Sequence, residues 1–144
     1  MMILPFQPDH LTALSLQDAQ SHLWGVVPAD YGFWLRAQGN AYTFLIADRP
    51  VACCGLVQEW EGRAFAWALL SPAVRPVMGR LTRLVDRYFT MSPVRRIEAQ
   101  VPEGFEQGHR WARLLRFENE GPMKHYLPDG GTAYRYARYQ PCPP

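Results

Sequence analysis

The chain has 144 residues, of which 48% are hydrophobic and 19% are charged, a balance typical of a globular protein with one core. Its formal net charge of +2 is too small to indicate nucleic acid as a partner. No apolar run approaches the ~18 residues of a membrane span, and the N-terminus has no signal-peptide pattern. The three cysteines, two of them adjacent (Cys53 and Cys54), argue against a disulfide framework and a metal site. We therefore expect a cytoplasmic protein without a bound metal.

Short elements are expected in the first 40 residues. Residues 2–7 predict an edge strand, because Pro5 and Pro8 cannot serve in a central one. Short helices are predicted at about 9–14, at 15–25 and within 28–39. The second of them has Ser15 as a candidate N-cap and Gly25 as a stop.

Three strands and a long helix are expected next. Apolar runs at 41–48, 51–60 and 63–70, joined by short turns at 48–50 and 61–62, indicate an antiparallel meander. Apolar residues then recur at helical spacing from Val77 to Phe89. The opposite side of this helix carries arginines, and we expect it to be a solvated face, with contact to an anionic partner surface as the alternative. These residues are Arg80, Arg83 and Arg87.

The last third of the sequence predicts a strand at 95–101, a helix at 103–117 and strands at 121–127 and 132–139. Residues 128–131 read Pro-Asp-Gly-Gly and predict a hairpin turn between the last two strands. The whole order is β-α-α-β-β-β-α-β-α-β-β, which indicates an α+β fold. We expect a single domain over residues 1–140 and a Pro-rich tail at 141–144.

This element order resembles the GNAT superfamily of acetyl-CoA-dependent N-acetyltransferases. Arg116-Phe117 is similar to the Gly-Phe step after the last helix of the family, and Glu120-Gly121 to the pair before its final hairpin. The resemblance implies a mixed, mostly antiparallel sheet of six to seven strands, flanked by about four helices. The segments VRPVMGRLTRLVDRYF (74–89) and RRIEAQV (95–101) are similar to short members from tailed bacteriophages, in particular the internal virion protein A family of T7-like phages.

In this superfamily a loop of pattern Q/R-x-x-G-x-G/A holds the CoA diphosphate at the start of the long helix. Helix N-terminal amides suit a phosphate, and glycines allow its close approach. Arg75 keeps the first position, but Met78 and Arg80 replace small residues and Pro76 removes an N–H donor. We favour a segment that no longer binds CoA; a modified cradle, in which Arg75 and Arg80 supply charge, is the alternative. If the site binds acetyl-CoA, the resemblance assigns the contacts to Leu70, Arg75, Val77, Met78, Gly79, Arg80 and Leu81.

The usual acid and base of the superfamily have no counterpart here. The family often places a Glu on the fourth strand and a Tyr in the last helix, and the corresponding residues are Trp67 and Ala112. Glu59 and Tyr126 are the substitute catalytic candidates, and His109 is a further proton carrier. A surface Glu, a half-buried strand Tyr and a solvated helix His are the simpler interpretations of these three residues.

Two functional hypotheses follow. The first is a non-catalytic GNAT-like protein, a phage virion or assembly component that contacts other phage or host proteins or further copies of itself. The second is an acetyl-CoA-dependent N-acyltransferase that acetylates an amine of a small molecule or protein, with water or the substrate carrying the proton. The first hypothesis places the protein in the host cytoplasm or in the virion.

Overall fold

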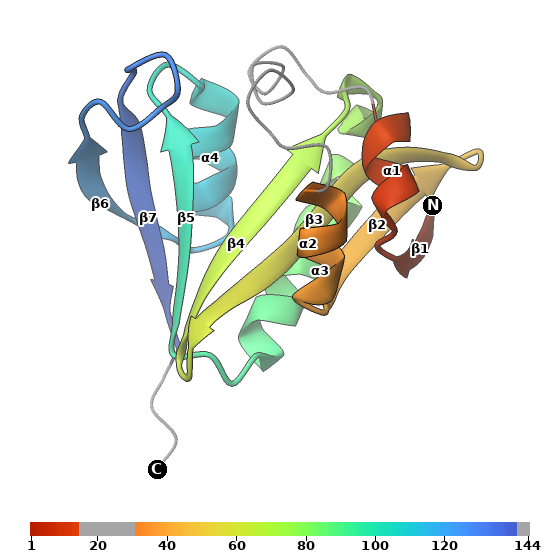
Figure 1. The fold of residues 1–144 in the computed structure, drawn as a ribbon, viewed down its shortest axis with the longest axis horizontal. Helices are drawn as coiled ribbons and strands as arrows, with labels where there is room; N and C mark the ends of the chain where they lie inside the picture. The colour runs from red at the N-terminus through yellow and green to blue at the C-terminus, as the bar shows by residue number, and fades with distance from the viewer. Residues whose placement is uncertain (15–30, 141–144) are drawn as a thin grey trace. The chain divides into compact units, whose positions relative to one another are not determined.

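The computed structural model describes residues 1–14 and 31–140, and over these residues the element order agrees with the prediction (Figure 1). Seven strands pair in the order β1-β2-β3-β4-β5-β7-β6. The β4–β5 pair is parallel, whereas β1–β2, β2–β3, β5–β7 and β6–β7 are antiparallel. The predicted α+β fold with a mixed, mostly antiparallel sheet is confirmed. The helix expected at 15–25 and the tail at 141–144 lie outside the described residues.

The chain divides into two compact units. The N-terminal unit comprises Met1–Val57 with Ala66–Met78, and the C-terminal unit comprises Gln58–Phe65 with Gly79–Pro144. The expectation of a single domain over 1–140 stays a prediction. No helix among the described residues is long and apolar enough to cross a membrane.

The N-terminal unit packs two short helices on a small antiparallel sheet. Its elements are β1 (Met2–Pro5), α1 (Pro8–Ala13), α2 (Tyr31–Ala37), β2 (Asn40–Ile46), β3 (Arg49–Trp60) as far as Val57, and β4 (Arg63–Leu70) from Ala66. As predicted, β1 is an edge strand, and all four of its residues are exposed. The first fully packed side chain after it is Phe6, which is 2% exposed.

The β2–β3 hairpin turns earlier than the sequence suggested. Ile46 pairs with Arg49, so the turn consists of Ala47 and Asp48, whose φ angles are +49° and +63°. Two consecutive residues with positive φ are typical of the type I′ turn, which matches the twist of the strands that it joins. Pro50 was expected in the turn, but it belongs to β3.

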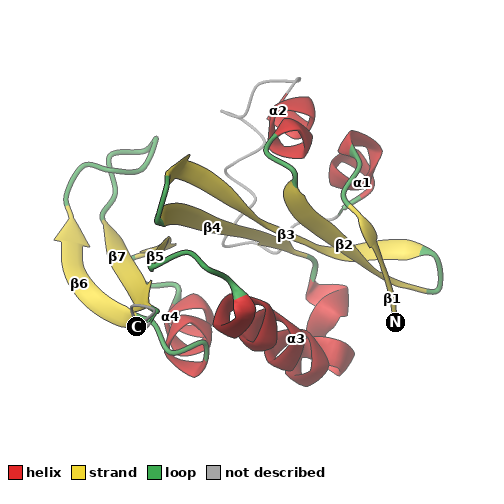
Figure 2. Ribbon diagram, turned by 90° about the horizontal axis from the view of Figure 1, so that it is seen from below, coloured by secondary structure: helices red, strands yellow, loops and turns green. Residues whose placement is uncertain are grey.

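The C-terminal unit places two helices on one face of a sheet. Its elements are the start of β4, α3 (Met78–Met91) from Gly79, β5 (Arg96–Pro102), α4 (Glu106–Leu114), β6 (Glu118–Met123) and β7 (Ala133–Tyr139). Tyr136 contacts α4 through His109, and Arg138 contacts α3 through Asp86. Because side chains alternate along a strand, both helices cover the face that carries Tyr136 and Arg138 (Figure 2).

The helix α3 is amphipathic as predicted. Leu81 and Phe89 are 0% and 6% exposed and form its buried side. The three arginines expected on a solvated face, Arg80, Arg83 and Arg87, are exposed.

Two predictions at the C-terminal end of the chain were wrong in their bounds. The helix expected at 103–117 begins at Glu106 and ends at Leu114, because Gly104 and Arg116 adopt positive φ angles of +85° and +64°. The strand expected at 121–127 is β6, which ends at Met123, where that residue pairs with Ala133. The turn predicted at 128–131 is present, since the Gly130 N–H donates to the Leu127 carbonyl at 2.8 Å, but it lies inside a nine-residue connection, 124–132, and does not join the two strands directly.

Candidate functional site

The chain leaves β4 through a capped helical turn. Ser71 is the N-cap of a 3-10 helix, η2 (Pro72–Val77), and its hydroxyl accepts a hydrogen bond from the Ala73 N–H at 3.2 Å. The Ser71 carbonyl accepts from the Val74 N–H at 3.0 Å, and the Ser71 N–H donates to the Val51 carbonyl at 2.9 Å. This cap fixes the start of the turn by satisfying amides that a helix N-terminus otherwise leaves unpaired.

The rest of the turn offers few free N–H donors. Pro72 and Pro76 have no N–H, and the Met78 N–H donates to the Arg75 carbonyl. η2 therefore continues directly into α3, without the open glycine loop that could wrap a diphosphate. Five of the seven residues 72–78 have no free amide: two are prolines, and Ala73, Val74 and Met78 donate within the turn.

The first turn of α3 is basic and uncovered. A Cβ atom added to Gly79 would meet only the Arg83 Nη1 atom, 3.9 Å away. Arg80 and Arg83 are exposed, and the first turn of α3 contains no acidic residue. An anion could approach this end of the helix. The positive charge here comes from the arginine side chains and not from a glycine loop of main-chain amides.

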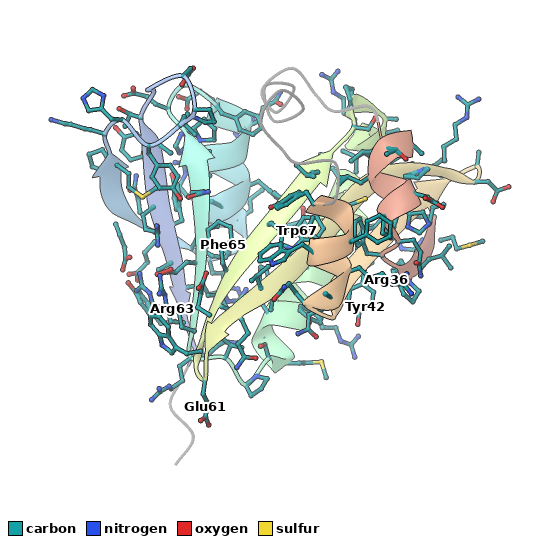
Figure 3. All side chains as sticks on the ribbon, viewed as in Figure 1. Arg36, Tyr42, Glu61, Arg63, Phe65 and Trp67 are labelled. Atoms are coloured by element: carbon teal, nitrogen blue, oxygen red, sulfur yellow. The ribbon has the colours of Figure 1, made fainter. Side chains whose placement is uncertain are left out.

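Trp67 occupies the β4 position at which a catalytic carboxylate was sought. Its half-buried ring packs edge-on against Phe6, with ring centroids 5.6 Å apart, on the side of β4 that carries α1 and α2 (Figure 3). The ring fits because Gly55 has no side chain: a Cβ atom there would lie 2.8 Å from Trp67 Nε1. The indole Nε1 is buried without a partner among the described residues. An indole N–H is a donor only, so Trp67 cannot act as a base.

His109 on α4 is a structural residue. It is 8% exposed, with Nδ1 2.7 Å from the Tyr136 hydroxyl and Nε2 3.0 Å from the Pro102 carbonyl. The carbonyl can only accept, so Nε2 carries the proton and Nδ1 accepts from Tyr136. The expectation of a solvated helix His was wrong. Ala112, which stands where the family often has Tyr, is 6% exposed.

The two substitute catalytic candidates are both on the surface. Glu59 is exposed near the end of β3, as the simpler interpretation predicted. Tyr126 is 43% exposed and lies beyond β6, so its assignment to a strand was wrong. Its backbone N–H donates to the Gly131 carbonyl at 3.0 Å, inside the connection to β7. Catalytic roles for Glu59 and Tyr126 stay predictions.

A buried carboxylate cluster was missed by the sequence analysis. Glu98 on β5 is 3% exposed and accepts hydrogen bonds from three arginines: Arg63 Nη2 at 2.8 Å, Arg96 Nε at 3.0 Å and Arg135 Nη1 at 2.9 Å. Burial acts to raise the pKa of Glu98, but the hydrogen bonds from Arg63 and Arg96 outweigh it and hold the pKa below its ordinary value. Arg96 also pairs with Glu120, and this contact, with the Tyr139 hydroxyl, lowers the pKa of Glu120 to about 2.

The alternation of charged and apolar residues in RRIEAQV was the available signal for this cluster. It placed Glu98 and Arg96 on one face of a strand, but it did not identify the strand that supplies Arg135. The pairing of β5 with β7 identifies it. Glu98 lies opposite Ala137 and Gln100 lies opposite Arg135, so Arg135 is on the same face of the sheet as Glu98.

The cysteines offer no nucleophile. Cys53 is 0% exposed, and burial raises the pKa of its thiol to about 11, against a smaller opposing effect of the Thr43 hydroxyl. Burial likewise raises the pKa of Cys54. A thiol is reactive as the thiolate, so both are inert near neutral pH. Among the residues that the structure describes, no group of three or more His, Cys, Asp or Glu could hold a metal ion.

Solved structures share this architecture. No family model matches the sequence, and no curated protein is detectably similar to it. The structure is similar to Ard1 from Thermoplasma volcanium with a TM-score of 0.80, at 16% identity and covering 97% of each chain. It is also similar to a GNAT-family acetyltransferase from Streptococcus pneumoniae (TM-score 0.74, 11% identity, 97% of this chain and 99% of that one). A putative phosphinothricin N-acetyltransferase gives a TM-score of 0.75 at 12% identity, covering 97% of this chain and 98% of the other.

The chain has the GNAT fold. At these identities the likeness establishes the fold and leaves the reaction to be argued from the residues. The cofactor that a GNAT fold implies is acetyl-CoA, and the turn from Ser71 to Met78 does not fit the diphosphate of that cofactor. The amides of Ala73, Val74 and Met78 are bonded inside the turn, and its two prolines have none.

The residues predicted to contact the cofactor follow one another along β4, the turn and α3. Leu70 and Leu81 are 7% and 0% exposed, so their side chains serve the core, and the side chains of Arg75 and Arg80 are exposed. Cofactor contacts by the whole set stay a prediction: Leu70, Arg75, Val77, Met78, Gly79, Arg80 and Leu81.

Proposed function

We propose that this chain is a non-catalytic GNAT-fold protein that acts by binding other proteins, as a component of a phage particle or of its assembly. The observation that carries the proposal is the turn before α3. A GNAT enzyme holds the CoA diphosphate on main-chain amides at this point, and here the amides of Ala73, Val74 and Met78 are hydrogen-bonded within the turn.

The residues at the positions of the usual catalytic base and acid also support a non-catalytic function. Trp67 cannot accept a proton from an amine, and Ala112 cannot return one to a thiolate. Amine acetylation needs both transfers, and general acid–base catalysis typically contributes about 10²–10⁴-fold to a rate. A protein that lacks these groups together with the diphosphate cradle has little of the machinery of acetyl transfer.

Exposed aromatic residues on α2 suit a protein partner. Phe33 and Trp34 are 64% and 49% exposed, and Trp34 stacks on Tyr31 with ring centroids 5.8 Å apart. Rigid aromatic side chains are enriched at protein interfaces and often dominate their energetics. The phage setting is supported by the sequence resemblance of residues 74–89 and 95–101, and co-purification of the protein with phage particles is its test.

The test of the non-catalytic function combines binding with turnover. Acetyl-CoA is titrated into the protein by calorimetry, and CoA release is followed with a thiol reagent in the presence of a panel of amines. We expect no saturable binding at millimolar acetyl-CoA and no release above background. A triple variant that restores the two small residues of the pattern and the missing N–H donor (Met78→Gly, Arg80→Gly and Pro76→Gly) is the matched control for the turn. Acetyl-CoA-dependent turnover by the unmodified protein would refute the proposal.

A second candidate function is an acetyl-CoA-dependent N-acyltransferase, and it is favoured by the likeness to GNAT acetyltransferases and by the open first turn of α3. In this case Arg80 and Arg83 would attract the diphosphate beside Gly79. The Arg83→Gln variant discriminates the two functions. It weakens acetyl-CoA binding several-fold if the second function is right, and it has no effect on a protein that does not bind CoA.

A further inference from the structure

The helix layer of the C-terminal unit carries exposed arginines that have no partner. α3 and α4 lie side by side on one face of the sheet (Figure 2), where the Trp111 indole donates to the Thr82 hydroxyl at 2.9 Å. Five arginines of these two helices are exposed, and their side chains form no hydrogen bond or ion pair with the described residues. They are Arg80, Arg83 and Arg87 on α3, and Arg110 and Arg113 on α4.

Few carboxylates oppose these arginines. The two helices contain two acidic residues, Asp86 and Glu106. Asp86 is already bound by two guanidinium groups, those of Arg116 at 2.8 Å and Arg138 at 2.9 Å. Even when Glu103, which precedes α4, is counted as a third acid, the exposed arginines of this surface, Arg116 included, outnumber the acids two to one.

Two further acids of the C-terminal sheet lie on its opposite face. Tyr136 on β7 contacts α4 through His109, so the next residue, Ala137, points away from the helices. Glu98 on β5 and Glu118 on β6 are both register partners of Ala137, and they share its face. The net charge of +2 for the whole chain therefore conceals a helix surface that is strongly basic.

The surface around the arginines is mostly polar. Both helices turn their apolar sides to the core, where Leu81, Phe89 and Ala112 are 0%, 6% and 6% exposed. A protein interface usually has an apolar core, and a helix that lies on a membrane inserts its apolar side chains. Within these two helices, large apolar side chains are exposed only in the last turn of each one, at Tyr88, Met91 and Leu114.

A nucleic acid duplex fits this surface better than a protein or a membrane does. Protein–DNA interfaces are more polar and much more positively charged than protein–protein interfaces. A guanidinium group is planar and always charged, and it matches phosphate oxygens through two parallel hydrogen bonds. The arginines stand on two helices of one folded unit, so they form a fixed array, which suits the regular phosphate rows of a duplex.

We propose that the outer surface of α3 and α4 binds double-stranded DNA through its phosphates, without reading its sequence. The five unpaired arginines donate to phosphate oxygens, and counterions condensed on the duplex are released. This binding requires neither CoA nor the protein contacts of the proposed function, so it goes beyond that function. Arg110 and Arg113 are not among the residues that would hold a diphosphate in the second candidate function, so the two sites can be tested apart.

The salt dependence of binding measures the number of phosphate contacts. A fluorescein-labelled duplex of about 20 base pairs is titrated with the protein at neutral pH, and its anisotropy is followed at salt concentrations from about 50 to about 200 mM. Each contact adds about 0.9 to the slope of log Kd against log salt, so about four contacts give a slope of about 3.6 and a loss of affinity of about 100-fold over this range. We expect this slope for two duplexes of unrelated sequence. No saturable binding at about 50 mM salt, or a slope below about one, would overturn the inference.

A double variant tests whether the arginines of this surface make the contacts. Arg110→Gln with Arg113→Gln removes two side chains without a partner, so it should keep the unfolding midpoint of the unmodified chain and lower the slope by about two. Arg36→Gln with Arg49→Gln, at two exposed arginines of the N-terminal unit, removes the same charge and is the matched control, which should keep the slope. A folded Arg110 and Arg113 variant with an unchanged slope, or an equal loss of slope in both variants, would refute the assignment to this surface.

Two competitors test the choice of DNA over other anionic partners. A poly-glutamate peptide represents an acidic protein, and vesicles that contain phosphatidylserine represent a membrane. We expect neither to displace the duplex at an equal concentration of negative charge, because the duplex carries one charge per about 1.7 Å of its length and releases its condensed counterions on binding. Displacement by either competitor would refute DNA as the partner.

Discussion

Replacing Glu98 by glutamine should strongly destabilise the protein, because this carboxylate holds together three arginines from β4, β5 and β7. Oxygen atoms of Glu98 accept from Arg63 at 2.8 Å, Arg96 at 3.0 Å and Arg135 at 2.9 Å, and the residue is 3% exposed. The Glu98→Gln variant leaves the three guanidinium groups around a neutral amide. The NH2 group of this amide must also face the N–H donors of the arginines.

The expected loss in the free energy of unfolding follows from how deeply Glu98 and its arginine partners are buried. Removing one partner of a buried ion pair costs about 3–5 kcal/mol. The arginine side chains are 27%, 31% and 25% exposed, and water screens part of their repulsion, so we expect the lower end, about 3 kcal/mol. For a chain of this size that corresponds to a fall in Tm of about 6 to 12 °C.

The assay is thermal and urea unfolding of the two proteins side by side. Glu118→Gln is the matched control, because Glu118 is an exposed residue of β6 and its replacement should change the free energy of unfolding by less than about 0.5 kcal/mol. An unchanged midpoint in Glu98→Gln would refute the assignment of the cluster as a stabilising element.

The pH dependence gives a second readout of the same residue. The pKa of Glu98 in the folded protein is below its ordinary value of 4.5, so the ionised carboxylate adds stability above about pH 4.5. This contribution is lost as the pH falls through the folded-state pKa. The difference in stability between the unmodified protein and Glu98→Gln should therefore shrink in acid. A difference that grows below pH 4.5 would contradict the direction of the shift.

Three further substitutions test other parts of the fold by their effect on the free energy of unfolding. Ser71→Ala removes the hydroxyl that caps η2 and should cost about 1 kcal/mol; a neutral result would mean that the cap does not fix the turn. Tyr136→Phe leaves His109 Nδ1 buried without its donor and should cost about 1–3 kcal/mol, whereas unchanged stability would show that water replaces the hydroxyl. Gly55→Ala places a Cβ atom 2.6 Å from a backbone oxygen and 2.8 Å from Trp67 Nε1, so we expect a loss of about 1–3 kcal/mol; a stable variant would show that β3 can shift.

Elements with a clear period or turn chemistry could be predicted from the sequence. The apolar run of β4 gave both of its ends, Arg63 and Leu70, because a Gly-containing turn precedes it and Ser71-Pro72 follows it. The start of α3 was located within one residue by the spacing of its apolar side chains. The 3-10 helix before it was missed, because two prolines and a short polar cap have no periodic signal.

The errors at the C-terminal end have a local physical cause. Arg116 adopts a left-handed φ of +64°, a conformation that residues other than glycine rarely take, so the end of α4 before it could not be predicted from the residue types. The early end of α4 lets β6 begin at Glu118, three residues before the predicted strand. The Glu98 cluster could not be assembled either, because it depends on which strands become neighbours in the sheet, and sequence alternation shows only the face of each one.

The most direct test of the central claim follows the backbone amides of the turn during a titration with coenzyme A. If the amides of Ala73, Val74 and Met78 stay hydrogen-bonded within the helical turn from Ser71 to Met78, their N–H signals will not move at millimolar coenzyme A. Saturable shifts of these signals at micromolar coenzyme A would contradict the account, because they would show that the turn opens to hold a diphosphate.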